Sequence, residues 1–231
     1  MATIAKFYLL DAVSPNTGIM PSNDPSVIGG GPLGAGSSAA GAATARDATD
    51  VAGTSNPDLE ATCTAEAAAT SQILGLRRFV SRPLAAQTFA PGDGNWTFDW
   101  AAFDSNTNHA GAGDGTRCDI YCWRPSTGAQ VGTGIAPIGL SGTLSTTEAH
   151  FSAVSTFGPS TTIQDGDILV FDVFTNFTQG MAVAYTESFS YNGTTEGSIT
   201  TCASFVTPPS PLTLFVPAPP AVPGPPSLAF M

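Results

Sequence analysis

Positive charge is the scarcest property of this 231-residue sequence. Lys and Arg together number seven against 18 Asp and Glu, which gives a formal net charge of −11. Binding to phosphate groups requires clustered cations. The densest basic stretch, Arg77, Arg78 and Arg82, is too small to follow a nucleic-acid backbone. We therefore expect neither nucleic acid nor an anionic membrane as a partner.

The sequence also shows no pattern typical of a secretory leader or a membrane span. The first residues, MATIAKFYLL, lack a basic segment followed by a long apolar one, and no run of about 18 apolar residues occurs. We therefore expect the four cysteines, Cys63, Cys118, Cys122 and Cys202, to be free thiols. Cys118 and Cys122 would lie roughly 13 Å apart on one strand face, too far for a disulfide.

Charged residues of both signs make up only 11% of the chain, whereas Gly (25 residues) and Pro (19 residues) are frequent. The surface must then consist largely of Ser, Thr, Asn, Gln and Gly. The length suits one all-β domain with long extensions and allows a substantial core.

The clearest strand pattern lies in residues 116–128, TRCDIYCWRPSTG. Side chains alternate along a strand, so one face would carry Arg117, Asp119, Tyr121 and Trp123, and the other would carry Cys118, Ile120 and Cys122. Neither face is plainly polar, which predicts a well-buried strand. Pro125, Ser126 and Gly128 then predict a tight turn.

Further strands follow the same logic. Residues 95–103 alternate strictly, and residues 167–177, DILVFDVFTNF, are apolar on both faces, which predicts a central strand. Asn192-Gly193 predicts a hairpin between strands at 181–191 and 198–206.

About ten short strands without helical periodicity predict an all-β fold, an antiparallel β-sandwich of the jelly-roll type, over residues 71–206. Residues 1–10 predict an N-terminal strand. Residues 11–70, rich in Ala, Gly, Ser and Thr, and residues 207–231, rich in Pro and free of charge, predict extended arms. Within the first arm, Asn56, Pro57 and the Ala-rich residues 59–70 are compatible with a short helix.

Two motifs could hold a ligand. Gly29, Gly31 and Gly34 match the spacing of a dinucleotide-binding loop, but Pro32 interrupts it and no strand–helix context surrounds it. Asp104, Asn106 and Asn108 match the first ligands of a calcium loop. His109 and Gly115 stand where that loop needs Gly and Glu, which favours a polar loop tip, while a different Ca²⁺ site that includes Asp114 remains open.

The candidate catalytic residues are few. His109 and His150 have no partner at nucleophile or metal-ligand spacing, and Asp165 and Asp167 flank a glycine at a strand start, where turn formation is their common use. The aromatic residues Trp96, Trp100, Tyr121 and Trp123 could stack on sugars, but period-two aromatics favour a core. The sequons at Asn95, Asn176 and Asn192 carry little weight without a leader. We predict no catalytic, cofactor or metal site, and no enzymatic activity.

Six segments of the chain are distinctive: KFYLLDA, RRFVSRPLAAQTF, NWTFDWAAFDSN, IYCWRPSTGAQVGT, QDGDILVFDVF and TQGMAVAYTESFSYNGTTE. Together they resemble a poorly characterised group of virion structural proteins from tailed bacteriophages. The resemblance covers the N-terminal strand and most of residues 70–206, and it implies a virion location and a sandwich fold without any family site residues.

The resulting hypothesis is a capsid decoration, or cement, protein. It would be made in the host cytoplasm, form a homotrimer on the capsid surface, and contact the major capsid protein and neighbouring copies of itself through its arms. A tail- or fibre-associated virion protein and a carbohydrate-binding module for host-surface glycan are the alternatives.

Overall fold

The structure, a computed structural model, describes residues 2–13, 46–54, 58–63, 72–90, 92–104, 115–138, 144–156, 160–177 and 185–217. Every regular element in these ranges is a β-strand, so the all-β prediction is confirmed there. The strands are β1 (Thr3–Ile4), β2 (Phe7–Val13), β3 (Arg46–Thr49), β4 (Asp58–Cys63), β5 (Gln72–Ser81), β6 (Gln87–Phe89), β7 (Asn95–Asp104), β8 (Gly115–Arg124), β9 (Ala129–Ile138), β10 (Ala149–Thr156), β11 (Thr161–Ile163), β12 (Ile168–Phe177), β13 (Tyr185–Ser190), β14 (Phe205–Thr207) and β15 (Leu212–Thr213).

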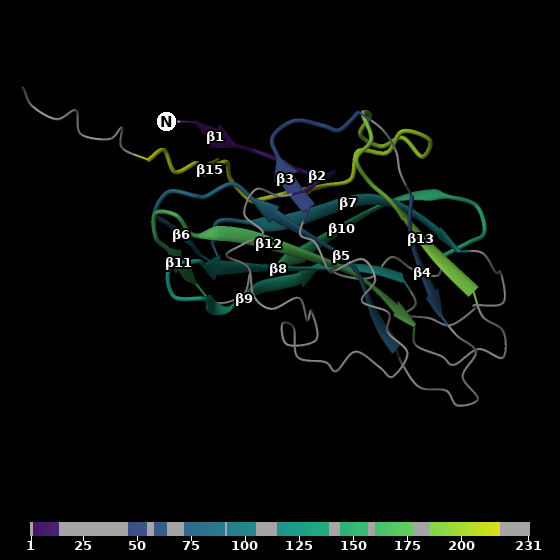
Figure 1. Ribbon diagram of the computed structural model, residues 1–231, viewed down its shortest axis with the longest axis horizontal. Helices are drawn as coiled ribbons and strands as arrows, with labels where there is room; N and C mark the ends of the chain where they lie inside the picture. The colour runs from purple at the N-terminus through teal and green to yellow at the C-terminus, as the bar shows by residue number, and fades with distance from the viewer. Residues whose placement is uncertain are drawn as a thin grey trace, which may run out of the picture.

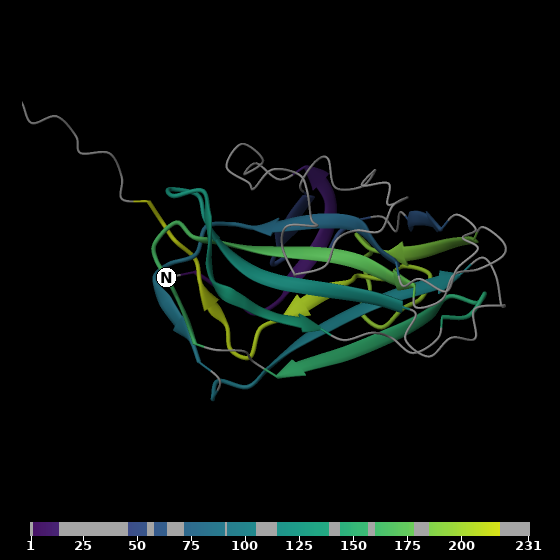
Figure 2. The same ribbon diagram turned by 90° about the horizontal axis from the view of Figure 1, so that it is seen from below.

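Eleven of the described strands form one sheet in the order β4-β13-β7-β14-β2-β3-β5-β12-β8-β9, with β10 on the other edge of β7. Neighbouring strands are antiparallel, except that β3 and β5 are parallel. Two short pairs, β1 with β15 and β6 with β11, complete the described strands. The sheet curls into a half-barrel (Figures 1 and 2). The curl brings β9, at one end of the strand order, close to β7 and β10, although β9 shares no ladder with either.

The concave side of the curled sheet contains the main core. Trp96, Phe98 and Trp100 project into it from β7, because alternate residues of a strand face the same side. The rings of Phe98 and Trp100 stack with centroids 4.3 Å apart, and Phe171 from β12 packs against Phe7 of β2 with centroids at 5.2 Å. Burial of each side chain of this size stabilises the fold by roughly 1.5–3 kcal/mol, so the buried aromatic residues of β7 contribute strongly to the core.

The two strands that we expected to be buried, β8 and β12, each contribute buried side chains to both faces of the sheet. β12 lies between β5 and β8. Leu169 and Phe171 face the core, whereas Ile168 and Val170 belong to a second cluster on the opposite face, with Val80, Tyr121 and Trp123. The prediction of a central strand at 167–177 is confirmed.

The segment expected to be an N-terminal arm contributes two strands. β3 lies between β2 and β5, and β4 pairs with β13 along its whole length. Composition could not predict this, because a ladder of backbone hydrogen bonds does not require large side chains; Ala48 is fully buried there. The prediction of a short helix after Pro57 is wrong for Asp58–Cys63, which form strand β4. Pairing with β13 outweighs the weak helical spacing of these residues.

The hairpin expected at Asn192-Gly193 is also wrong. β13 and β14 lie end to end on the same edge of β7 and do not pair with each other, and the strand expected at 198–206 begins only at Phe205. Residues 191–204 instead form a loop tied to β2, since Asn192 N donates to Leu9 O (2.9 Å) and Leu9 N donates to Ser204 O (2.9 Å). Asn192 nevertheless adopts the left-handed backbone conformation that is typical of an Asn-Gly turn, with φ of 63°.

The boundary expected at residue 206 does not hold, because the fold continues to Pro217. β14 pairs with β2 and β7, and β15 pairs with β1. Leu212 is only 2% exposed. Leu212, and in part Leu214, dock on the domain because burial removes them from water.

Candidate functional site

The place where the two ends of the described chain meet is the candidate functional site, which we call the terminal junction. It comprises β1, β15, residues 83–85 and the exit at 214–217. Leu214 N donates to Ala2 O (2.9 Å) and Phe215 N donates to Pro83 O (3.0 Å). Ala85 N donates to Thr213 O (2.9 Å), so residues 83–85 and the C-terminal segment are joined by backbone bonds at two points.

Side chains reinforce the terminal junction. Gln87 Nε2 donates to Thr213 O (3.2 Å), and Gln87 Oε1 accepts from Thr213 N (3.3 Å). Leu214 and Leu84 form a β-bridge, and Leu84 is fully buried. Val216, at the exit, is 68% exposed. Figure 1 shows β1 and β15 side by side at one end of the molecule. The described chain therefore ends, at Pro217, beside residues that are bonded to Ala2 and Pro83.

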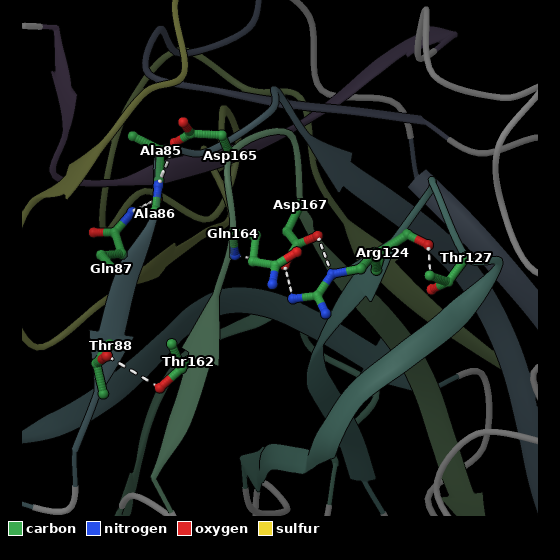
Figure 3. Close-up of polar contacts among 10 residues, drawn as sticks. All are labelled: Ala85, Ala86, Gln87, Thr88, Arg124, Thr127, Thr162, Gln164, Asp165 and Asp167. Carbon is green, nitrogen blue, oxygen red and sulfur yellow. Dashed lines mark hydrogen bonds and ion pairs between the residues drawn. The ribbon is translucent and has the colours of Figure 1, made fainter.

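The turn at Asp165 and Asp167 lies close to this junction and is structural (Figure 3). Asp165 Oδ1 accepts from Ala86 N (2.7 Å), and Asp167 Oδ2 accepts from Gln164 N (2.8 Å). Arg124, at the end of β8, donates two hydrogen bonds to the Asp167 carboxylate, from Nε to Oδ1 at 2.9 Å and from Nη2 to Oδ2 at 2.7 Å. Gly166, at φ of 91°, occupies a conformation that favours glycine. Each carboxylate thus fixes a backbone turn, as the sequence predicted.

The convex face of β5, β12 and β8 carries a row of charged and polar side chains that we call the outer charge row. Its members are Arg78, Asp172, Tyr121 and Asp119, which are buried, and Arg117, which is part-buried. Arg78 donates from Nε and Nη2 to the two oxygens of Asp172 at 2.7 and 2.9 Å. Tyr121 adds a third bond to Asp172 at 3.0 Å. Both members of the ion pair have side chains that are 2% exposed.

Electrostatics in the outer charge row favours a structural role. Burial raises the pKa of Tyr121, and the negative charge of Asp172 adds to this. Burial also raises the pKa of Asp119, which the hydrogen bond from Arg117 opposes. Buried charges are tolerated where they are paired and hydrogen-bonded. Sequence reasoning missed the Arg78–Asp172 pair, although an ionisable residue inside each apolar run was a signal that partners were required.

His150 and Ser152, on β10, meet Asp99 on β7. His150 Nε2 lies 3.9 Å from Asp99 Oδ1, and Ser152 hydrogen-bonds to the same carboxylate. Burial raises the pKa of Asp99, while the Ser152 hydrogen bond and the charge of His150 oppose the rise. Activation of a serine requires the imidazole to lie between the hydroxyl and the carboxylate. Here the carboxylate occupies the middle position, so this order does not activate Ser152.

Glu196 organises a second polar group, the Glu196 cluster, with Lys6 and Tyr8. Lys6 Nζ donates to Glu196 Oε2 at 2.6 Å, and Tyr8 donates to Glu196 Oε1. These two hydrogen bonds lower the pKa of Glu196. Burial, helped by the Glu196 hydrogen bond, raises the pKa of Tyr8 to about 12. The cluster links loop 191–204 to the start of β2 and was not predicted, since Glu196 is nearly 190 residues away from Lys6 and Tyr8 in the sequence.

The aromatic residues weighed as a sugar platform are buried. Trp96 and Trp100 are 0% exposed, Tyr121 2% and Trp123 8%. They pack as core residues, as the alternation predicted.

Three cysteines, Cys118, Cys122 and Cys202, are buried free thiols, as predicted. Burial raises the pKa of each of them. The side chain of Cys63 lies outside the described residues.

The glycine motif at 29–34, the loop positions 106, 108 and 114, and His109 lie outside the described residues, as does the side chain of Asp104. Among the residues that are described, no group of three or more His, Cys, Asp or Glu side chains could hold a metal ion. The described part of the chain likewise has no helix with the length and apolar character to cross a bilayer.

No protein-family model and no curated protein matches the chain. Two crystal structures of a CocE/NonD family hydrolase from Staphylococcus aureus are similar to it, each with a TM-score of 0.42, at 10% and 11% sequence identity. The match covers 72% of this chain but only 34% of the hydrolase, so the chain spans about a third of that protein's length. Nothing about the activity of this chain follows from a likeness of this size.

Proposed function

We propose that the chain is a non-enzymatic structural protein of a tailed-bacteriophage virion that decorates the outer capsid surface and stabilises the shell. The half-barrel, which we assign to the β-sandwich class with jelly-roll connectivity, is the projecting body. Residues 218–231 are the attachment segment, and the major capsid protein is the partner. The observation that carries this proposal is the terminal junction, which fixes the start of that segment.

The chemistry of residues 218–231 suits attachment. The segment has no charge, and five of its fourteen residues are Pro. Proline restricts the backbone of the free chain, so ordering this segment on a surface costs less entropy than ordering a flexible one. Leu228 and Phe230 supply apolar area, which stabilises a bound state by about 25 cal/mol per Å² removed from water. Anchoring the segment at one end lowers the cost further, since that end is already ordered.

The described side chains support a structural role in preference to chemistry. The carboxylates of Asp165, Asp167 and Asp172 are committed to turns or ion pairs, and Asp99 is placed wrongly for nucleophile activation. The buried tryptophans argue against a carbohydrate-binding platform built on them. A location on the tail or fibre remains the alternative outcome of the imaging experiment described in the Discussion.

A truncation tests the attachment segment. A chain that ends at Pro217 keeps β15 and the terminal junction, so we expect an unchanged melting temperature and a loss of binding to purified capsids of the source phage in co-sedimentation. The variant Leu228→Ser/Phe230→Ser should show the same loss in the full chain, whereas Ser227→Ala should bind normally. Unchanged occupancy of the truncated chain would contradict the proposal.

A further inference from the structure

Asn192 and Gly193 form a pair with chemistry of its own, because Asn192 is the one asparagine of the sequence that precedes a glycine. Asparagine is thermally labile in proteins, since the backbone nitrogen of the next residue can attack its side-chain amide carbon. The N–Cγ bond forms, the Cγ–Nδ2 bond breaks, and ammonia leaves with the proton of the attacking nitrogen. Water then opens the cyclic imide at either carbonyl, which leaves aspartate or isoaspartate. Glycine favours ring closure because it has no Cβ to hinder it.

The fold holds the attacking nitrogen in a hydrogen bond. Gly193 is buried, and its N donates to Cys202 O at 2.8 Å. A Cβ on Gly193 would lie only 2.1 Å from the same oxygen, so the two backbone segments leave no room between them. To attack, the nitrogen must break this bond, lose its proton and move toward the side chain of Asn192. The closed loop 191–204 therefore protects Asn192.

Asn192 itself is held from two other parts of the chain. Its backbone N donates to Leu9 O, on β2, at 2.9 Å. Its side-chain Oδ1 lies against Gly53, after β3, where an added Cβ would approach that oxygen to 2.3 Å. Closure of the imide ring changes the torsion angles of Asn192, which has φ of 63° in the fold. Both contacts oppose that change, so the protection depends on β2 and on the segment after β3 as well as on Cys202.

We propose that Asn192 is a modification site that is protected while loop 191–204 is closed and that becomes aspartate or isoaspartate when the loop opens locally. Residues 194–197 of the loop are exposed, and one of its ties is the partly exposed ion pair between Lys6 and Glu196. Such segments open at a lower free energy than core strands. Isoaspartate lengthens the backbone at a point of tight backbone packing, so a modified loop cannot restore its contacts. This inference does not depend on the virion proposal.

Peptide mass spectrometry on the full chain tests the protection. At mildly alkaline pH, Asn192 should be converted about tenfold or more slowly in the folded chain than in the chain unfolded by urea, because conversion waits for the open state. Asn95 is exposed but precedes Trp96, so it should remain asparagine on this timescale in both states. Equal rates at Asn192 in the two states, or conversion of Asn95 as fast as that of Asn192 in urea, would overturn the proposal.

Two buried serines test whether the opening is local. Ser204 Oγ donates to Ser190 O, and Ser204→Ala should raise the rate at Asn192 by about tenfold, because it leaves a buried carbonyl with one bond fewer. Ser81 is equally buried and accepts from Leu169 N at 2.9 Å. Ser81→Ala should lower the melting temperature without changing the rate, because local opening of the loop leaves β5 and β12 paired.

A milder loop variant, Glu196→Gln, supports the same test. It removes the charge that Lys6 Nζ contacts at 2.6 Å, and it should raise the rate by about twofold to fivefold, as expected for an exposed ion pair. Circular dichroism and melting temperature confirm that each variant folds. No acceleration by either loop variant, or equal acceleration by Ser81→Ala, would overturn the proposal.

Discussion

Asp172→Asn should be among the most damaging single substitutions on the convex face of the sheet. The Asp172 carboxylate accepts two bonds from Arg78, at 2.7 and 2.9 Å, and one from Tyr121 at 3.0 Å. Asp172 is 1% exposed and Arg78 2%. An asparagine is neutral and presents an N–H₂ group toward donors, so the guanidinium loses its counter-charge in a buried position.

The expected loss is about 3–5 kcal/mol, the usual cost of removing one partner from a buried ion pair. A domain of this kind has only about 5–15 kcal/mol of total stability, so the loss is a large fraction of it. At roughly 2–4 °C per kcal/mol for a chain of this size, the melting temperature should fall by about 6–20 °C. Tyr121→Phe, which removes a single neutral donor, should cost only about 1 kcal/mol.

Urea unfolding followed by tryptophan fluorescence measures these losses, since Trp96 and Trp100 are fully buried and report on the core. Asp50→Asn, on an exposed residue, is the control and should change stability by less than about 0.5 kcal/mol. The double variant with Tyr121→Phe should lose less than the sum of the two single losses, because both act on the same carboxylate. A loss below about 1 kcal/mol for Asp172→Asn, as for a surface pair, would refute the reasoning.

Three further predictions concern other parts of the fold. Glu196→Gln should lower stability at neutral pH by at most about 1 kcal/mol, since the side chain is partly exposed and screened. Because the pKa of Glu196 is lowered on folding, its contribution is present above the unfolded pKa and is lost as pH falls through the folded one. The melting curves of variant and wild type should therefore converge in acid, and a constant gap would contradict this origin. Gly193→Ala should destabilise loop 191–204, because a Cβ there would overlap the carbonyl oxygens of Thr201 and Cys202; an unchanged melting temperature would count against this packing. At most one of the four thiols should react with a thiol reagent before unfolding, because the three described ones are buried with raised pKa; rapid labelling of two or more would show that these strands open.

The sequence predicted the strands whose burial is encoded locally. The alternation through Trp96, Phe98 and Trp100 and the two apolar faces of residues 168–173 are properties of single segments, and the structure places both as expected. The Asp165-Gly166 turn was predictable for the same reason, because its hydrogen bonds arise from local backbone geometry.

Features that depend on distant pairing could not be predicted. The bond between Arg78 and Asp172 requires the register of β5 against β12, which neither strand encodes alone. β3 is short and carries only one large side chain, Arg46, but it becomes part of the sheet because β2 and β5 lie on either side of it. The terminal junction was missed because the prolines around Leu212 and Leu214 are typical of an extended tail, whereas pairing with β1 and Leu84 holds these residues on the domain.

Imaging of the phage particle tests the central proposal most directly. A cryo-electron microscopy reconstruction, with the chain identified by a label fused to one terminus, gives its position and copy number. The proposal predicts many copies over the outer capsid shell, with residues 218–231 in contact with the major capsid protein. A few copies at a single vertex would assign the chain to the tail, and its absence from purified particles would contradict a virion role altogether.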